Sequence, residues 1–131
     1  MLLDAIVLPD DLEWEDEITW TPIAQLIERS VTGALFIQES EIVMGRPITL
    51  TGSDDMAWIT RLIVDSLVVK RNTIGLKMDL TIGTGTKQRV FKVMFRQGEN
   101  PVDVRPVRKG EAFWDNTWYA INAIRLMEVS P

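Results

Sequence analysis

The sequence predicts a mainly β (α+β) fold with one α-helix, arranged as a β-sandwich or a split β-barrel. Apolar and polar residues alternate from Leu76 to Ile82, which is the spacing of a half-buried strand. Helical spacing of apolar residues marks the segment from about Asp54 to Lys70. The other apolar runs are short and bounded by turn-forming residues. With 131 residues, the chain is expected to fold as one domain (residues 1–131) with its own core.

Strand-like segments lie on both sides of the predicted helix. They are short apolar runs bounded by polar or turn-forming residues: Met1–Leu8, Ile23–Ser30, Ala34–Gln38, Ile42–Met44, Arg46–Thr51, Leu76–Ile82, Lys87–Arg96, Pro101–Val107 and Trp118–Val129. Turns are expected at Thr32-Gly33, at the polar residues Gln38–Glu41 and at Gly83–Gly85. The last of these lacks the spacing of a phosphate-binding loop and lies between two strands, so it predicts a hairpin.

The predicted helix has polar signals at both ends. Ser53 is placed to accept a hydrogen bond from the first turn, and Lys70 and Arg71 lie at the negative end of the helix dipole. Arg61 and Asp65 are one turn apart and are expected to form an ion pair. The apolar stripe expected to face a sheet consists of Trp58, Ile59, Leu62, Ile63 and Leu67.

The chain contains neither Cys nor His. This composition excludes a disulfide framework and thiolate metal sites, and it removes the commonest general base and metal ligand. No apolar run approaches the ~20 residues that span a bilayer, and Leu2–Leu8 lacks the basic flank of a signal peptide. We therefore expect a protein of the cytoplasm that is not an enzyme, with no cofactor, no metal and no membrane insertion.

Charge is divided unevenly along the chain, whose net charge is −5. Residues 1–60 contain 12 Asp and Glu against two Arg, a net charge of −10. Residues 61–131 contain 12 Lys and Arg against seven acidic residues, a net charge of +5. In a ring of identical subunits, one half could meet the other half of a neighbour. Folding could equally intermix the two halves within one chain.

The densest acidic run lies between Asp10 and Glu17 and includes Asp11, Glu13 and Glu15. The run lacks the alternating Asp/Asn pattern, the central Gly and the terminal Glu of an EF-hand loop, so it does not predict a calcium site. Nor does the sequence set the separation of roughly 5–10 Å that paired glycosidase carboxylates need. A cell-wall hydrolase is therefore only a third hypothesis, and we expect this run to face solvent or a partner.

Arg105, Arg108 and Lys109 form the densest basic cluster. Because the isoelectric point is about 4.7 and no basic stripe is present, the cluster does not predict nucleic-acid binding. Pairing with an acidic neighbour is the simpler use of these charges, since such pairs set register and specificity.

Five tryptophans are many for a chain of this length. Trp58 falls within the helical stripe and is expected in the core. Trp14 and Trp114 have acidic neighbours and are expected to be partly exposed, which suits an interface between subunits. An exposed indole could also stack on a sugar, so a small carbohydrate- or receptor-binding module is the alternative function.

The order of strand, helix and hairpin in residues 45–95 resembles small tail-tip and baseplate proteins of tailed bacteriophages. The likeness rests on Gly45–Gly52, the helix through Trp58–Lys70 and the hairpin Met78–Phe95, and Leu8–Asp16 looks similar to that group too. The predicted architecture is similar to the β-barrel-plus-helix domain of distal tail proteins and to tail-tube-like folds.

This resemblance implies a structural component of the virion tail that is assembled in the host cytoplasm. It implies a homo-oligomeric ring, often six-fold in such assemblies, at the end of the tail tube beside the hub or the tape-measure protein. The residues expected at the interface between subunits are Asp11, Glu13, Trp14, Glu15, Glu17, Arg105, Arg108, Lys109 and Trp114.

Overall fold

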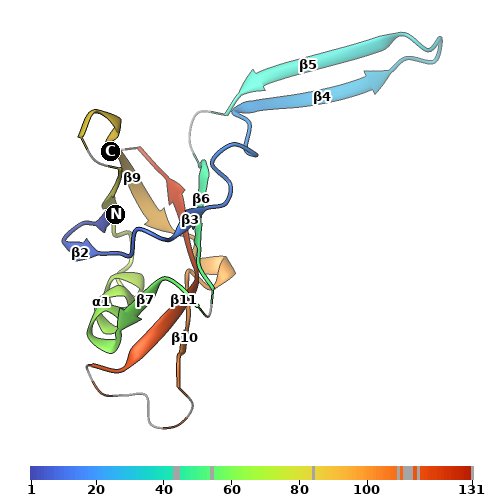
Figure 1. Cartoon of the computed structure of the whole chain (residues 1–131). Coiled ribbons are helices and arrows are strands. Elements are labelled where there is room, and N and C mark those ends of the chain that lie inside the picture. The colour runs from blue at the N-terminus through green and yellow to red at the C-terminus, as the bar shows by residue number, and fades with distance from the viewer. Residues whose placement is uncertain are drawn as a thin grey trace.

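The structure, a computed structural model, describes residues 1–42, 45–53, 55–83, 85–108, 110, 114 and 116–130. In chain order its elements are β1 (Leu2–Leu3), β2 (Ile6–Val7), β3 (Glu13–Trp14), β4 (Ile23–Arg29), β5 (Leu35–Glu41), β6 (Pro47–Thr51), β7 (Trp58–Thr60), α1 (Arg61–Arg71), β8 (Met78–Ile82), the 3₁₀ turn η1 (Gly85–Lys87), β9 (Arg89–Phe95), the 3₁₀ turn η2 (Gln97–Glu99), β10 (Val102–Pro106) and β11 (Trp118–Glu128). In the described part of the chain, the predicted mainly β fold with a single α-helix is confirmed (Figure 1).

The long strand β11 organises the larger sheet, whose order is β2-β1-β8-β9-β11-β6-β3. It pairs antiparallel with β6 and β7 along one side and with β9 and β10 along the other. At one edge of the sheet, Trp14 of β3 packs edge-on against Phe91 of β9, with 5.3 Å between ring centres. This contact shows that the sheet curls back on itself, in the sandwich-like arrangement that the sequence predicts.

Alternation along the strands builds the core. Ile48 and Leu50 are fully buried on β6, while their neighbours on the same strand are half-buried. β11 is buried on both faces near its start, which explains why its sequence is nearly continuous in apolar residues. The other fully buried large side chains are also apolar: Leu3, Leu8, Ile59, Leu67, Met78, Leu80, Val93, Ile121, Ile124 and Leu126.

Helix α1 begins at Arg61 and not near Asp54, so the predicted start is wrong. Trp58–Thr60 form β7 and pair with the first three residues of β11. Pairing with a central strand satisfies the backbone of this segment and overrides its helical spacing. Ser53 makes an isolated bridge with Met56 instead of capping the helix, and Asp54 lies outside the described residues.

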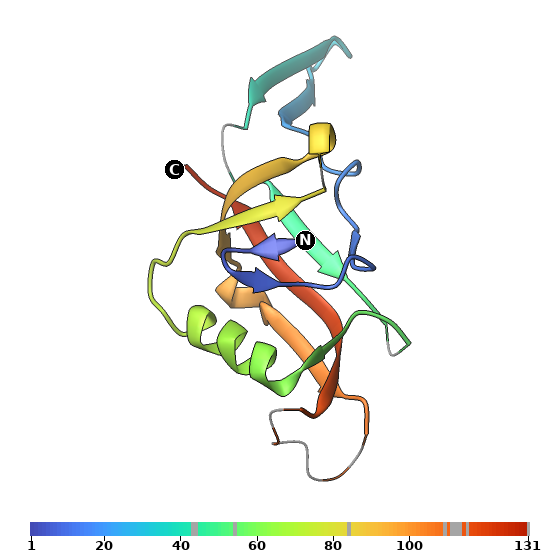
Figure 2. The same ribbon diagram turned by 60° about the vertical axis from the view of Figure 1, so that its left-hand side comes forward.

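The buried face of α1 also differs from the predicted stripe. Helix α1 lies beside the sheet (Figure 2) and contacts β7, β10 and β11. Val64 and Leu67 are buried, whereas Leu62 is 59% exposed. Trp58, which was expected in the core, is 42% exposed. The predicted stripe is therefore confirmed for Ile59, Ile63 and Leu67, which are buried or pack on the core, and wrong for Leu62 and Trp58.

The polar features of the helix follow the sequence more closely. The predicted ion pair joins Arg61 Nε to Asp65 Oδ1 at 2.8 Å, and Lys70 and Arg71 occupy the last turn. Arg61 also donates to the hydroxyl of Tyr119, and its hydrogen bonds to Asp65 and then Tyr119 raise the pKa of its guanidinium.

The N-terminal strand expected at Met1–Leu8 is broken at Asp4, where φ is +52°. The Asp4 carboxylate accepts hydrogen bonds from the backbone N–H of Asp79 at 2.9 Å and from Lys70 Nζ at 3.1 Å. Desolvation is the largest influence on this carboxyl and raises its pKa, but the hydrogen bonds and the Lys70 charge together lower the pKa below 3.8. Asp4 therefore ties β1, β8 and α1 together through its ionised form.

Two hairpins that the sequence predicts are confirmed. β8 and β9 pair in the register Met78 to Val93, with turn residues Gly83 and Gly85 at positive φ. β4 and β5 pair around Thr32-Gly33. The turn predicted at Gln38–Glu41 is wrong, because β5 continues as a strand to Glu41. A further strand is predicted at Ile42–Met44, but residues 43 and 44 lie outside the described residues.

Gly52 marks the closest approach of two backbones in the core. A Cβ atom at this position would lie 2.8 Å from the Cβ of Ala57 and would collide with the carbonyl oxygen of Ile121. Only glycine therefore lets the chain leave β6 and turn into β7 while staying against β11.

Candidate assembly surfaces

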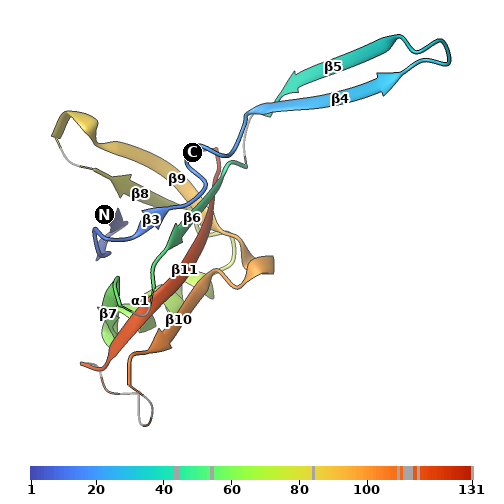
Figure 3. The same ribbon diagram turned by 45° about the vertical axis from the view of Figure 1, so that its right-hand side comes forward.

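The β4–β5 hairpin projects away from the curled sheet into solvent (Figures 1 and 3). Each of the seven residues of β4 and the seven residues of β5 is exposed. Its large apolar side chains are roughly half-exposed or more: Ile23, Leu26, Ile27, Leu35, Phe36 and Ile37. The sequence predicts both strands, but it does not reveal that the pair stands apart from the core.

The register of the hairpin sorts these side chains onto two faces. Residues directly opposite each other share a face. Phe36 lies opposite Glu28, and Leu26 shares their face, where Phe36 is 57% exposed and Leu26 52%. Ile27 lies opposite Ile37 on the other face. Both faces therefore present apolar surface, which a free monomer leaves in water.

The tip of the hairpin is closed by local hydrogen bonds. Ser30 N–H donates to the carbonyl of Ala34 at 2.8 Å, and the Ser30 hydroxyl accepts from Ala34 N–H at 3.0 Å. Gly33 adopts φ +87°, a backbone conformation that glycine enters without strain. The turn is thus fixed by its own residues.

The base of the hairpin is held by four residues, Trp14, Trp20, Arg46 and Arg89, which we call the root cluster. The Arg46 guanidinium lies 4.8 Å from the Trp14 ring centre and 5.6 Å from that of Trp20. Arg89 lies 5.1 Å from the Trp14 ring centre. Trp20 precedes β4 and Arg46 follows β5, so the cluster joins the two chain segments that enter and leave the hairpin.

Hydrogen bonds reinforce this cluster. Arg46 Nη2 donates to the carbonyl of Glu17 at 2.7 Å, and Arg89 Nη2 is 2.9 Å from Glu17 Oε1. The Nε of Arg46 is buried and has no hydrogen-bond partner among the described residues. Cation–π contacts of roughly 0.5–2 kcal/mol each offset that unmet bond.

Two carboxylates of the acidic run form hydrogen bonds that hold the fold together. Asp16 accepts hydrogen bonds from Trp14 Nε1 and from both the N–H and the hydroxyl of Thr49, each at 2.9 Å. Asp11 accepts from the N–H of Ala57 at 2.9 Å. These two carboxylates therefore stabilise the fold.

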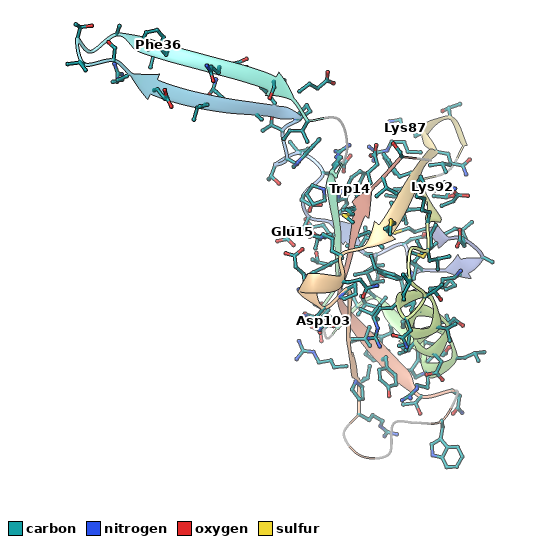
Figure 4. All side chains as sticks on the ribbon, turned by 180° about the vertical axis from the view of Figure 1, so that it is seen from behind. Trp14, Glu15, Phe36, Lys87, Lys92 and Asp103 are labelled. Carbon is teal, nitrogen blue, oxygen red and sulfur yellow. The ribbon has the colours of Figure 1, made fainter. Side chains whose placement is uncertain are left out.

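The remaining predicted acidic residues are Glu13, Glu15 and Glu17. Glu13 and Glu15 are exposed along the β3 edge, where Figure 4 labels Glu15, and Glu17 pairs with Arg89. Glu17–Arg89 and Asp4–Lys70 join the acidic and basic halves within one chain, so folding does intermix part of the divided charge.

The predicted basic residues lie away from the acidic run. Arg105 is the last residue but one of β10 and lies opposite Ala120, and Arg108 follows the strand; both are exposed. β11 and β6 separate β10 from β3, so Glu13 and Arg105 of one subunit are three strand spacings apart across the sheet, roughly 14 Å. They are also offset along the strands, because Glu13 aligns with Ala123 of β11 and Arg105 with Ala120. Lys109 lies outside the described residues, and Trp114 is 59% exposed.

A pocket that the sequence does not predict opens where β11 begins. Its volume is about 430 Å³, and the described residues lining it are Trp58, Val107, Arg108, Asn116, Thr117 and Trp118. The indoles of Trp58 and Trp118 lie 6.4 Å apart between ring centres, and Trp118 is 51% exposed. A second, shallower hollow of about 300 Å³ lies against the same two indoles. Pairing of β7 with β11 brings these tryptophans together, and no local pattern indicates that pairing.

Within the described residues, His, Cys, Asp and Glu form no group of three or more that could hold a metal ion. The same part of the chain contains no helix with the length and apolar character needed to cross a bilayer. Comparisons with protein-family models, with curated proteins and with solved structures find no match to this chain.

Proposed function

We propose that this protein is a structural component of a bacteriophage tail tip or baseplate, where it forms a ring at the distal end of the tail tube and joins the tube to the hub. The assembly part of this proposal is carried by the projecting β4–β5 hairpin. The phage-tail part rests on the resemblance of residues 45–95 and Leu8–Asp16 to such proteins. Its partners would be further copies of itself and the tube, hub and tape-measure proteins, in the virion tail after assembly in the host cytoplasm.

The exposed hairpin supports assembly because leaving its apolar side chains in water is energetically unfavourable. A two-stranded hairpin without packing partners is at best marginally stable in water. This hairpin also exposes apolar side chains such as Phe36 and Ile27 on opposite faces. Covering even the Phe36 face in a neighbouring subunit would contribute roughly 25 cal/mol for each Å² of apolar surface removed from water.

The root cluster supports the same function. A hairpin that moves freely, here called an arm, loses conformational entropy when it binds a partner, and this loss weakens binding. Arg46, held between Trp14 and Trp20, fixes the direction of the hairpin before any partner arrives. The mechanism we propose is therefore geometric: a stiff barrel presents a pre-aimed arm, and no chemical step is involved.

Native mass spectrometry and negative-stain images of the purified protein test the assembly part. We expect a homo-oligomer with cyclic symmetry at micromolar concentration. A Leu26→Ser/Phe36→Ser variant should be monomeric and still unfold cooperatively, with a thermal midpoint that no longer depends on protein concentration. Val69→Ser, at an exposed position of α1, is the matched control. A wild-type protein that is monomeric at every concentration contradicts ring formation.

Mass spectrometry of purified phage particles tests the tail part. We expect the chain in intact particles, in a copy number equal to the symmetry of the isolated ring or a multiple of it. If the ring forms but the chain is missing from particles, it is an assembly factor and not a tail component.

The Trp58–Trp118 pocket favours a second candidate, a small carbohydrate- or receptor-binding module. Aromatic faces beside a hydrogen-bonding side chain such as Asn116 suit a sugar. Trp14 is poorly suited to stack on a sugar, because the guanidinium groups of Arg46 and Arg89 already lie over its ring. Glycan-array binding that is lost on Trp118→Ala or Trp114→Ala would favour this function, and an array without hits would exclude it for the glycans displayed.

A further inference from the structure

We infer that the Trp58–Trp118 pocket of one subunit receives Phe36 from the hairpin of a second copy of this chain. The inference rests on the self-assembly proposed above and specifies the contact that drives it. It joins Phe36, the aromatic residue of the hairpin strands, to the pocket that two exposed indoles line in the curled sheet.

The two surfaces lie at opposite ends of the molecule. The hairpin root is fixed at the end of β11, where Gly45 N–H donates to the carbonyl of Glu128 at 3.0 Å. The pocket is at the other end of the strand, at Trp118. Ten residue steps along a strand span roughly 30 Å, and the hairpin points away from the barrel (Figures 3 and 4). One subunit therefore cannot fill its own pocket.

The pocket suits an aromatic anchor. The indoles of Trp58 and Trp118 are tilted at 43° to each other and leave a mainly apolar hollow of about 430 Å³. Aromatic rings pair best in offset-stacked or edge-to-face geometry at about 4.5–7 Å between centres. An aromatic side chain buried in a pocket is the usual centre of a protein interface.

Charge supports the same pairing. Glu28 lies directly opposite Phe36 and shares its face of the hairpin. Arg108 is the charged residue among the described residues that line the pocket. The hairpin strands carry Glu28, Glu39 and Glu41 against Arg29, a net charge of −2. Phe36 in the pocket would bring Glu28 towards Arg108, and complementary charge of this kind fixes register.

The geometry of the contact determines the assembly. A hairpin that enters a different surface on its neighbour makes a heterologous, head-to-tail contact. Such contacts repeat around a ring when the rotation closes. Two hairpins that paired with each other would instead make a two-fold dimer with no ring.

Cross-linking between copies tests this geometry, because the chain has no native cysteine. Gln38→Cys lies on the Phe36 face of the hairpin, and Asn116→Cys lies in the pocket wall. With a short bismaleimide, we expect dimers when the two variants are mixed and none from either variant alone. Dimers from Gln38→Cys alone would show hairpin-to-hairpin pairing and overturn the inference.

Affinity measurements by analytical ultracentrifugation test the residues. Phe36→Ala and Trp118→Ala should each weaken self-association about tenfold or more, and the double variant should lose little beyond that. Ile27→Ala, on the other hairpin face, is the matched control and should change the affinity less than about threefold. Phe36 lies far from the core, so its replacement cannot unfold the barrel.

A charge exchange completes the test. Glu28→Arg and Arg108→Glu should each weaken association, and the variant carrying both should recover most of the loss. Equal affinities for Phe36→Ala and wild type would overturn the inference while leaving a ring intact, so its failure is distinguishable from failure of the proposed function. Absence of mixed cross-links in a protein that still forms a ring would do the same.

Discussion

The Arg46 guanidinium lies 4.8 Å from the centre of the Trp14 ring, and this contact fixes the direction of the hairpin. Arg46 follows the hairpin in the chain, whereas Trp14 belongs to β3 at the edge of the sheet. The contact therefore ties the segment that leaves the hairpin to the curled sheet, and the contact of Arg46 with Trp20 ties in the segment that enters the hairpin.

Replacing Arg46 with Lys should loosen the arm. A lysine keeps the charge but loses the flat stacking surface and the geometry of the bond to the Glu17 carbonyl. We expect a loss of about 1–2 kcal/mol in the free energy of unfolding. Pulsed electron spin resonance between labels at Gln38→Cys and Asn116→Cys should show a broader distance distribution, measured with doubly labelled chains diluted into an excess of unlabelled chain so that distances between subunits do not contribute. Arg29→Lys, on the exposed arm itself, is the control, and equal widths in both variants would exclude this role for the root cluster.

A side chain at Gly52 should be poorly tolerated. Gly52→Ala forces its Cβ into the Ile121 carbonyl and the Ala57 side chain. Overpacking of this kind costs roughly 1–3 kcal/mol, seen as a lower urea midpoint at unchanged slope. Gly98→Ala is the matched control, because a Cβ there meets nothing within 4 Å. Similar midpoints for the two variants would mean that β6 and β11 are less closely packed than the structure shows.

Two leucines of α1 should differ sharply in their effect on stability. Leu67 is fully buried and Leu62 is 59% exposed, although the sequence predicts both on the sheet-facing side. Leu67→Ala should cost about 2–5 kcal/mol in the free energy of unfolding, and Leu62→Ala less than about 0.5 kcal/mol. Chemical denaturation measures both, and a large loss for Leu62→Ala in a protein shown to be monomeric would place Leu62 on the sheet-facing side of the helix, as the sequence predicts.

Asp4 should make stability depend on pH. Its folded-state pKa lies below the usual 3.8, so its ionised form stabilises the fold above that pH and the contribution is lost as the pH falls through the folded value. Asp4→Asn should lower the free energy of unfolding at pH 7 by roughly 0.5–1 kcal/mol, a surface-pair magnitude. The difference from wild type should shrink below about pH 4.

Denaturation of both proteins at several pH values measures this effect. Glu41→Gln removes one negative charge from the exposed hairpin and controls for net charge. A difference between Asp4→Asn and wild type that stays constant down to pH 2 would assign the effect to packing.

The exposed acidic residues of the β3 edge test the charge complementarity expected from the sequence. Glu13→Lys/Glu15→Lys should weaken self-association and change its salt dependence, because two attractive charges become repulsive at a neighbouring basic surface. Glu17 is left intact, since its bond to Arg89 supports the root cluster. Sedimentation at low and high salt is the measurement, and unchanged association at low salt would remove this edge from the interface.

Local patterns explain which parts of the fold the sequence predicts. Alternation from Leu76 to Ile82 and the glycines after it identify the β8–β9 hairpin, because strand and turn preferences act within a few residues. The ion pair between Arg61 and Asp65 follows from helical spacing alone.

Long-range pairing explains what the sequence could not predict. Trp58 sits in a helical pattern yet pairs with Ala120, more than sixty residues away, and that pairing creates the pocket with Trp118. One sequence pattern could have indicated that the β4–β5 hairpin stands apart from the core. Leu26-Ile27 and Phe36-Ile37 place apolar residues on both faces of each strand, which favours either a fully buried sheet or an arm that a partner covers.

The route from the hairpin into the barrel has a mechanical consequence. β6 begins at Pro47, directly after the hairpin root, and pairs antiparallel with β11 through the five residues up to Thr51. Tension applied to the hairpin therefore enters the sheet at the Pro47 end of β6, and we consider the part of that force that acts along β6. A force in this direction loads the backbone hydrogen bonds between β6 and β11 in shear. These hydrogen bonds then share the force and do not break one after another. For this part of the force, the hairpin is attached in the shear geometry, in which a β-sheet resists pulling most strongly.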